Sequence, residues 1–497
     1  MPSLIDLAFS GAGLTAKARP WPHAVIDREA WTFAAGELAA GRWSLCALWG
    51  EPRAAQMALR DESSNEIGIF TLPCPDNRFP SIGRVHAPAI RLERAMQDLW
   101  GLTPENAPDA RPWLDHGKWG DGAHEAACKY DFLKADGENL HQVAVGPVHA
   151  GTIEPGHFRF TASGETVVRL EERLGYAHKG VEKLMIGANL AAGLALAERI
   201  SGDSTVAYGI AYCRAVEAAL ELQPPPRAEW LRALALEMER VANHLGDFGA
   251  ICNDAAFSLI HAHCAMLREE VLRAAEAAFG GRLMRGVVIP GGVRSTQTAG
   301  ALEGIRELAD RIDRRLDLLY ETYEETSSLQ DRTAATGRVS TALVARFAAG
   351  GFVGRASGRA YDARKAHPFP PYDSLSFETP VLSAGDVDAR VRIRVLEIRQ
   401  SLMLIRQIIL GLPGGRQHVD APTVSEQRVG AAIVEGFRGD IFASVRLSPD
   451  GKIERCHMRD PSWFQWPLLE AAVEGNIIAD FPLCNKSFNC SYSGHDL

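Results

Sequence analysis

Three long segments with apolar residues at helical spacing constrain the fold of this chain most. In 229–250, 301–323 and 388–412 the apolar side chains recur every three or four residues. That period places them on one face of an α-helix. A helix with one apolar face must bury it against another element. The three segments therefore predict a helical bundle at the centre of the structure.

Short apolar runs bounded by turn residues predict strands beside the bundle. The runs at 43–50 and 66–74 are typical of strands, and 28–41 and 90–102 have the composition of helices. A further pair of strand-like runs within 157–174 meets at Ser-Gly, a turn sequence suited to a hairpin. These elements predict small sheets in addition to the helical bundle.

The composition changes between Thr103 and Asn139. This stretch is rich in proline, glycine and aspartate and has no periodicity, which is typical of a linker, although its aromatic residues favour a strap lying on a surface. We therefore predict an α+β protein. It has a small α/β domain at 1–102, a linker or strap at 103–139, and a large, mainly helical bundle domain with a small antiparallel sheet at 140–497.

Charge and cysteine content exclude several classes of protein. Lys+Arg 53 against Asp+Glu 62 gives a net charge of −9, which argues against a nucleic-acid partner. No run reaches the ~20 apolar residues of a transmembrane helix, and the N-terminus does not have the pattern of a signal peptide. The nine scattered cysteines then indicate reduced thiols. We expect a cytoplasmic location.

Three segments carry unusual chemistry, namely 146–158, 354–380, and 433–445 together with the C-terminal 477–497. Taken singly, their histidines and arginines have ordinary explanations as hydrogen-bonded loop residues or surface charges. Their joint order and spacing is far more specific than any one of them.

That order resembles the large-subunit family shared by energy-converting [NiFe]-hydrogenases and the quinone-site subunit of respiratory complex I. The resemblance covers roughly 140–497. It rests on G-P-x-H at 146–149, L-G-Y-x-H-x-G-x-E-K at 174–183, E-x-x-R-x-x-x-H at 237–244, A-S-G-x-x-x-D-x-R-K continuing to a tyrosine at 356–372, and V-E-x-x-R-G at 434–439.

The first domain resembles the small partner subunit of the same complexes. It carries F-P-S-I at 79–82 and E-R-x-x-x-D-L-W-G-L at 93–102. Fusion of the two modules in one chain looks like the large subunits of formate hydrogenlyase and of the related hydrogenase-4 complexes.

The chain departs from the hydrogenase pattern at the metal ligands. The family supplies four thiolates as two C-x-x-C pairs, since soft sulfur holds both metals. Here Ser201, Ser204, Ser491 and Gly494 stand at those positions. We therefore expect no metal and no cofactor in this chain, with an iron–sulfur cluster in a partner subunit and a quinone as a candidate ligand. Cys484 and Cys490 leave another ion as a weaker alternative.

The resemblance implies a polar pocket in place of the metal, with Asp203 paired to an arginine and Glu154 as a proton relay. The expected catalytic residues are His149, Glu154, Asp203, Arg355, Asp362 and Arg364. The expected cofactor-binding residues are His157, His178, Tyr492 and His495.

These observations predict a metal-free, hydrogenase-like subunit of a membrane-bound complex I-like or hydrogenase-4-like oxidoreductase. It would couple electron transfer, with a quinone as one acceptor, to proton movement. We expect it at the cytoplasmic face of the membrane, bound to a small iron–sulfur subunit through 198–214 and 487–497 and to proton-translocating membrane subunits through 146–185. Two alternatives stay open: a genuine nickel-dependent hydrogenase, and a catalytically silent assembly scaffold.

Overall fold

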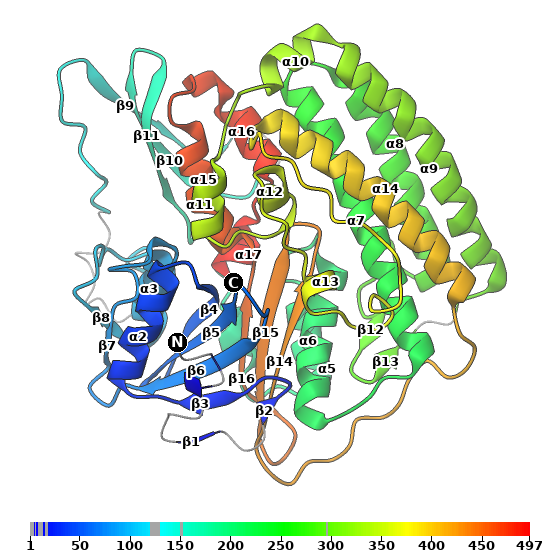
Figure 1. Ribbon diagram of the computed structural model, residues 1–497, viewed down its shortest axis with the longest axis horizontal. Coiled ribbons are helices and arrows are strands. Elements are labelled where there is room, and N and C mark those ends of the chain that lie inside the picture. Colours follow the sequence, from blue (N-terminus) through cyan, green and yellow to red (C-terminus); the bar gives the residue numbers. More distant parts are fainter. Residues whose placement is uncertain are drawn as a thin grey trace.

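The computed structural model describes residues 4, 6–7, 13–14, 18–119, 130–149, 153–294 and 297–497. Figure 1 shows long helices on one side, an N-terminal sheet on the other, and the C-terminal helices between them. This mixture of helices and several small sheets confirms the predicted α+β class. The boundaries at 102 and 139 remain a prediction.

Four long helices form the bundle. The three segments predicted as helices with one apolar face form α7 (Pro226–Asp254), α9 (Ala299–Glu325) and α14 (Val387–Gly411). The fourth helix, α8 (Ser258–Phe279), packs against α7 and α9. Local sequence sets their ends. The side chains of Thr298 and Asp386 accept the backbone N–H groups of Ala301 and Ala389 as N-caps, and Gly280 ends α8 in the left-handed conformation.

The N-terminal region contains a five-stranded sheet in the order β1 (Gly13–Leu14), β3 (His23–Val25), β6 (Ile67–Pro73), β5 (Ala54–Asp61), β4 (Trp43–Glu51). Helices α2 (Arg28–Ala39) and α3 (Ile90–Trp100) accompany it, with a small pair made by β7 (Arg78–Pro80) and β8 (Thr103–Glu105). The predicted helices and strands are confirmed here. Strand β5 was not predicted.

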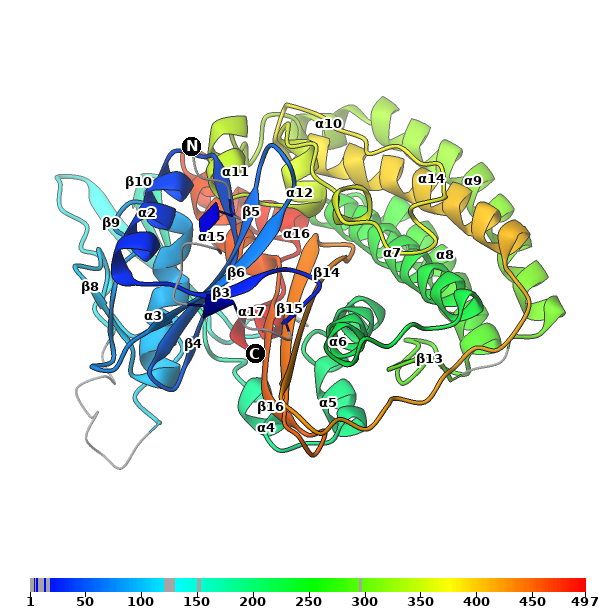
Figure 2. The same ribbon diagram turned by 60° about the horizontal axis from the view of Figure 1, so that its bottom comes forward.

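A second sheet, in the order β16 (Ile453–Arg459), β15 (Asp440–Leu447), β14 (Arg428–Glu435), β2 (Ala18–Arg19), stands between the N-terminal sheet and the helices (Figure 2). Helix α6 (Thr205–Leu220) packs on it. Residues of the N-terminal sheet, among them Trp49, pack against its Phe442. Because it is covered on both sides, its strands lack the alternating pattern of a half-exposed sheet, and they were not predicted.

The predicted hairpin is confirmed as β10 (His157–Ser163) and β11 (Thr166–Arg173), with β9 (Leu140–Val145) as a third antiparallel strand. The remaining elements are short connections: α4 (Val181–Met185), α5 (Leu190–Ala197), β12 (Val288–Ile289), β13 (Gly292–Val293), α10 (Ser327–Thr333), α11 (Thr341–Arg346), α12 (Gly351–Ala356) and α13 (Ala363–Ala366). The chain closes with α15 (Ser462–Val473), α16 (Phe481–Phe488) and α17 (Tyr492–Asp496).

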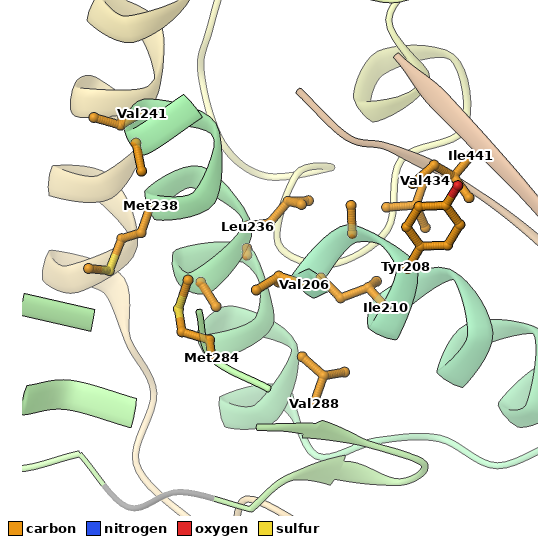
Figure 3. Close-up of a cluster of buried hydrophobic side chains, with 14 of the residues drawn as sticks. Val206, Tyr208, Ile210, Leu236, Met238, Val241, Met284, Val288, Val434 and Ile441 are labelled. Atoms are coloured by element: carbon orange, nitrogen blue, oxygen red, sulfur yellow. The ribbon is translucent and has the colours of Figure 1, made fainter. Parts of the chain in front are cut away.

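Two apolar cores hold these layers together. One fills the space between the long helices and the second sheet, and extends from Met238 and Val241 of α7 across Val206 of α6 to Val434 of β14 (Figure 3). The other joins side chains of the first 114 residues to the hairpin, to α12 and to the C-terminal helices. The N-terminal sheet is therefore packed into the body of the protein.

Candidate functional site

The loop between α5 and α6 carries the first two positions at which the family has cysteines. Ser201 Oγ donates to Asp203 Oδ1 at 2.8 Å and lies 2.8 Å from Ser491 Oγ. Ser204 Oγ lies 3.4 Å from the same Asp203 oxygen. All three serines are buried. The hydroxyl groups of Ser201 and Ser204 thus meet at one carboxylate, and Ser201 links this carboxylate to Ser491.

Arg438 completes this group, which we call the Asp203 cluster (Ser201, Asp203, Ser204, Arg438, Ser491). Its Nη1 donates to Asp203 Oδ1 at 2.7 Å and its Nη2 to Oδ2 at 2.5 Å, a bidentate pair. Burial alone would raise the pKa of Asp203, but the guanidinium of Arg438 lowers it below its ordinary value. The predicted pairing of Asp203 with an arginine is confirmed, and Arg438 is the partner.

Gly494, the fourth position, is enclosed by polar atoms. A Cβ at this residue would lie 2.5 Å from Asp460 Oδ2 and 2.8 Å from Ser491 Oγ. Its N–H already donates to Ser491 Oγ at 2.9 Å, which caps α17. A cysteine would fit here only if Asp460 moved, and Tyr208 holds Asp460 through its hydroxyl.

The residues present do not fit a nickel–iron centre. Three neutral hydroxyls and a glycine replace the four thiolates, and each hydroxyl already has a protein partner. Such oxygen groups are poor ligands for low-valent nickel or iron. Elsewhere in the described ranges, no group of three or more His, Cys, Asp or Glu is placed to hold a metal ion.

The cysteines near the C-terminus do not replace the missing ligands. Burial raises the pKa of the Cys484 thiol to about 12 and that of Cys490 well above its ordinary value, so both are neutral thiols at pH 7. All eight cysteines in the described part of the chain are buried and free. Cys128 lies outside it.

The C-terminal helix α17 anchors several expected cofactor-binding residues by packing. His495 stacks on Trp463 with ring centroids 3.9 Å apart, and its Nδ1 lies 2.8 Å from Asp496 Oδ1. His178 Nδ1 lies 2.6 Å from the carbonyl oxygen of Asp496. Burial lowers the pKa of His495. These contacts tie segment 174–180 to the end of the chain.

Tyr492 faces the other side of α17. Its ring packs edge-on against Trp466, with centroids 4.7 Å apart, and Asn485 Nδ2 lies 3.3 Å from its hydroxyl. The side chain is buried among aromatic residues that include Phe158 of β10. Tyr492 therefore lies in an apolar core rather than among the polar groups of the Asp203 cluster.

The loop before β10 holds both of its histidines against its own backbone. His149 Nε2 lies 3.0 Å from the Gly156 carbonyl oxygen, and His157 Nδ1 lies 3.0 Å from that of Gly146. Glu154 is exposed, and its Oε2 accepts the Ser493 N–H at 3.3 Å. Glu154 thus lies at the edge of α17, while 150–152 of the same loop are outside the described residues.

A second charge cluster lies deep between α7, α14 and β14. Arg355 donates from Nε to Glu397 Oε1 at 2.7 Å and from Nη1 to Glu435 Oε1 at 2.9 Å. Arg364 donates to Asp362 Oδ2 at 2.7 Å. We call this group the Arg355 network; it comprises Glu237, Arg240, Arg355, Asp362, Arg364, Glu397 and Glu435.

Charges in the Arg355 network do not balance. Four carboxyl groups face three arginines, and all seven side chains are essentially buried. Burial, with the nearby Asp362, raises the pKa of Glu435 to about 7. Arg355 keeps the pKa of Glu397 well below its ordinary value, although burial alone would raise it. His244 Nε2 also lies 2.9 Å from Glu397 Oε2, and Glu435, with its pKa of about 7, is the member of the network that is partly protonated near neutral pH.

The expected single pocket is divided into three groups. Asp203 belongs to the Asp203 cluster. Arg355, Asp362 and Arg364 belong to the Arg355 network, and the histidines, Tyr492 and Glu154 surround α17. Sequence reasoning did not assign roles to Glu397 or Arg438. The sequence did contain an indication that Glu397 is buried, because this charged residue lies directly beside the apolar face predicted for 388–412.

Comparison with known proteins identifies the family of the chain. A family profile described as "Respiratory-chain NADH dehydrogenase, 49 Kd subunit" matches residues 255–433. Formate hydrogenlyase subunit 5 of Escherichia coli (strain K12) is 30% identical over 438 residues, which cover 84% of this chain and 77% of that protein. A subunit of the NADH-quinone oxidoreductase of Koribacter versatilis (strain Ellin345) is 28% identical over 376 residues, covering 70% of this chain and 94% of that protein.

A solved structure shows the same likeness. A chain from the membrane-bound sulfane sulfur reductase, an archaeal respiratory membrane complex, matches with a TM-score of 0.68 and 28% identity; the match covers 72% of this chain and 99% of that one. This chain therefore belongs to the family that contains the 49 kDa subunit of respiratory NADH dehydrogenase, formate hydrogenlyase subunit 5 and hydrogenase-4 component G. Among the described residues, no helix combines the length and the apolar character needed to cross a bilayer.

Proposed function

We propose that this chain is a metal-free subunit of a membrane-bound, complex I-like oxidoreductase, attached at the cytoplasmic face. The observation that carries the proposal is the Asp203 cluster. It fills the place of the family's metal ligands with an ion pair and hydrogen-bonded serines. A member of this family with such a site can contribute proton handling, an organic ligand site or assembly, but not hydrogen chemistry on nickel.

Two features support proton movement, the Arg355 network and the carboxyl group of Glu154. Glu435 of the Arg355 network has a pKa of about 7, so it exchanges a proton near neutral pH. Glu154 lies at the edge of α17 and is exposed in this chain. It becomes a relay in a dry site only where another subunit covers it.

The partners proposed are a small iron–sulfur subunit and proton-translocating membrane subunits. Of the face expected at 198–214, helix α6 is buried almost throughout. Within 198–214 the surface is reached by the loop before α6, at Arg199, Gly202 and in part Asp203, and by Arg214 of α6, which is partly exposed. A partner would therefore touch this loop and the neighbouring segment 176–186, while α6 supports the loop from below. The sequence prediction gave all of 146–185 to the membrane subunits; this proposal moves 176–185 to the iron–sulfur subunit and leaves 146–149 and Glu154 for the membrane subunits.

The proposal is tested on the complex purified through a tag on this chain. We expect iron but no stoichiometric nickel, and an electron-transfer activity that responds to added short-chain quinone. Stoichiometric nickel bound to this chain would disprove the metal-free assignment. Absence of any redox partner and of any quinone effect would disprove the oxidoreductase role.

A scaffold role is the second candidate, because every side chain of the Asp203 cluster already has a partner within the chain. Replacing Asp203 with alanine separates the two candidates. If the complex assembles and keeps full activity, the cluster is structural only. If assembly persists and activity falls, the cluster takes part in the reaction.

A further inference from the structure

Arg91 of α3 extends from the N-terminal region to two carboxyl groups of the large domain. Its Nη1 lies 3.1 Å from Glu172 Oε2 on β11, and its Nη2 lies 2.7 Å from Glu470 Oε1 on α15. The backbone N–H of Glu172 donates to the same Glu470 oxygen at 2.8 Å. We call these three residues the Arg91 triad. The triad ties α3 to β11 and α15, which pack on each other (Figure 1).

The Arg91 triad is almost closed to water. The Glu172 side chain is 0% exposed, and the side chains of Arg91 and Glu470 are 11% and 22% exposed. Glu172 Oε1 is buried and has no hydrogen-bond partner among the residues that the structure describes. A buried carboxylate oxygen without a donor is far less favourable than a neutral carboxyl group. The geometry therefore favours a proton on this pair of carboxyl groups.

Two carboxyl groups share Arg91 because the arginines beside it have other partners. Arg94 and Arg111 both pair with Asp109, and Arg111 also pairs with Glu171. The other titratable groups around the triad are Tyr130, Arg173, Cys490, Tyr492 and His495, with Arg169 and Glu474 at the surface. Burial raises the pKa of Cys490 and of Tyr492 and lowers that of His495, so these three groups are neutral at pH 7.

The pKa values of the two carboxyl groups agree with the geometry. Burial raises the pKa of Glu470 above the ordinary value of 4.5 and raises that of Glu172 well above it. The charge of Glu470 raises the pKa of Glu172 further, and Arg91 lowers the pKa of both groups without offsetting burial. One guanidinium balances one carboxylate, so the second carboxyl group keeps its proton above pH 4.5.

A cavity of about 380 Å³ beside the triad leads to the surface. All three residues of the triad line it, together with the exposed Leu133 and Glu474. Glu470 is the more exposed of the two carboxyl groups, and Glu172 is the covered one. The cavity therefore gives the shared proton a route to solvent past Glu470.

We infer that the Arg91 triad is a proton-operated latch between the N-terminal region and the contact of β11 with α15. With one proton bound, the triad is electrically neutral and the three elements stay together. When the proton passes to water through the cavity, two carboxylates face one guanidinium, and their repulsion separates β11 from α15. Strand β11 pairs with β10, so the latch acts on the hairpin whose preceding loop carries His149 and Glu154. The latch does not depend on the proposed function.

Infrared spectra of the full chain test whether the two carboxyl groups share one proton. At about pH 6.5, we expect both Glu172→Gln and Glu470→Gln to lose the carbonyl band of one protonated carboxyl group. Each variant removes a single carboxyl group, and the carboxylate that remains is balanced by Arg91. The control, Glu165→Gln at the exposed turn of the same hairpin, should keep the band. A band that persists in either triad variant overturns the shared proton.

Hydrogen–deuterium exchange of the unmodified chain tests the latch without a substitution. Between the ordinary pKa of 4.5 and the raised pKa of the pair, opening releases one proton, so opening becomes more favourable as pH rises. The protection of amides in 166–173 and 462–473, corrected for the intrinsic exchange rate, should fall about tenfold per pH unit in this window. Helix α8 is the internal reference and should not change.

Glu470→Gln should abolish this pH dependence, because no surplus carboxyl group is then left to release a proton. Thermal unfolding verifies that the variant folds. Protection that is independent of pH in both segments of the unmodified chain would disprove the latch, whether or not the variant folds. A fall of the same size in Glu470→Gln would disprove it as well.

Discussion

The Asp203 cluster and the Arg355 network both bury charged side chains, but they differ in how well positive and negative charges balance. In the first, one carboxylate meets one arginine, and about a third of the Asp203 side chain (35%) is exposed. In the second, four carboxyl groups meet three arginines with almost no exposure. A balanced pair stays charged across the physiological range, while a surplus carboxyl group must take up a proton.

This difference gives the two groups different roles: the Asp203 cluster connects two segments of the chain, whereas the Arg355 network exchanges a proton. The Asp203 cluster joins the loop before α6 to the C-terminal segment through Ser491 and Asn489, as a metal bridged by two cysteine pairs would. The Arg355 network is tuned instead to a pKa near neutrality at Glu435. The four predictions that follow test the two roles, beginning with the largest effect.

Replacing Arg355 with methionine should have the largest effect. It leaves Glu397 and Glu435 buried without their cation, and the loss of one partner of a buried pair costs about 3–5 kcal/mol. Denaturant unfolding measures the loss. The matched control is Arg315→Met on the exposed face of α9, which should change stability by less than about 0.5 kcal/mol. A loss below about 1 kcal/mol at Arg355 would mean that the network is hydrated.

Replacing Arg438 with methionine should cost less, about 2 kcal/mol, because Asp203 is partly exposed and water replaces some of the lost contact. Hydrogen exchange should rise selectively in 489–497, since Arg438 also donates to the Asn489 carbonyl. Arg273→Met, which removes an exposed ion pair on α8, is the control. Unchanged exchange in 489–497 would show that the cluster does not connect the two segments.

Glu435→Gln should change the pH dependence of stability. The pKa of Glu435 is about 7 in the folded protein, above the ordinary value of 4.5. The folded state therefore binds the proton more tightly, and its stabilising effect is complete below about pH 4.5 and lost as pH rises through 7. The unmodified protein should lose about 1.3 kcal/mol between pH 6 and 8 through this group, and the variant should lose less. Equal slopes would place the network's proton on another residue.

Ser201→Ala should have the smallest effect. It removes the hydrogen bonds of Ser201 to Asp203 and Ser491, but Ser491 keeps the Gly494 N–H and Asp203 keeps Arg438. A net loss of about 1 kcal/mol is expected in denaturant unfolding. A loss as large as that of Arg438→Met would show that the serines, and not the ion pair, carry the connection.

Helices α7, α9 and α14, the hairpin and strands β4 and β6 were predictable because each has a pattern of its own. The stripe in 301–323, for example, puts one side of α9 in the core and leaves the other in water. Strands β14, β15 and β5 have no such pattern, because they are buried on both sides along most of their length. Packing between distant parts of the chain decides which segments cover these three strands.

For the site, the motif residues and the pairing of Asp203 were predictable, but their grouping was not. Spacing along the chain does not reveal that Arg355 meets Glu397 from α14 while Asp203 meets Arg438 from the turn after β14. Both pairs join residues far apart in sequence. The roles of His149, Glu154, His157 and His178 remain predictions.

The apolar core shared by the first 114 residues and the C-terminal helices has a consequence for biosynthesis. Leu92 and Trp113 are buried with Trp463 and Phe488, nearly four hundred positions later. During translation the early segment is complete long before the residues that cover it leave the ribosome. Contacts of such long range form slowly and leave apolar surface open meanwhile. We therefore expect the nascent N-terminal region to keep apolar surface exposed until the last helices are synthesised.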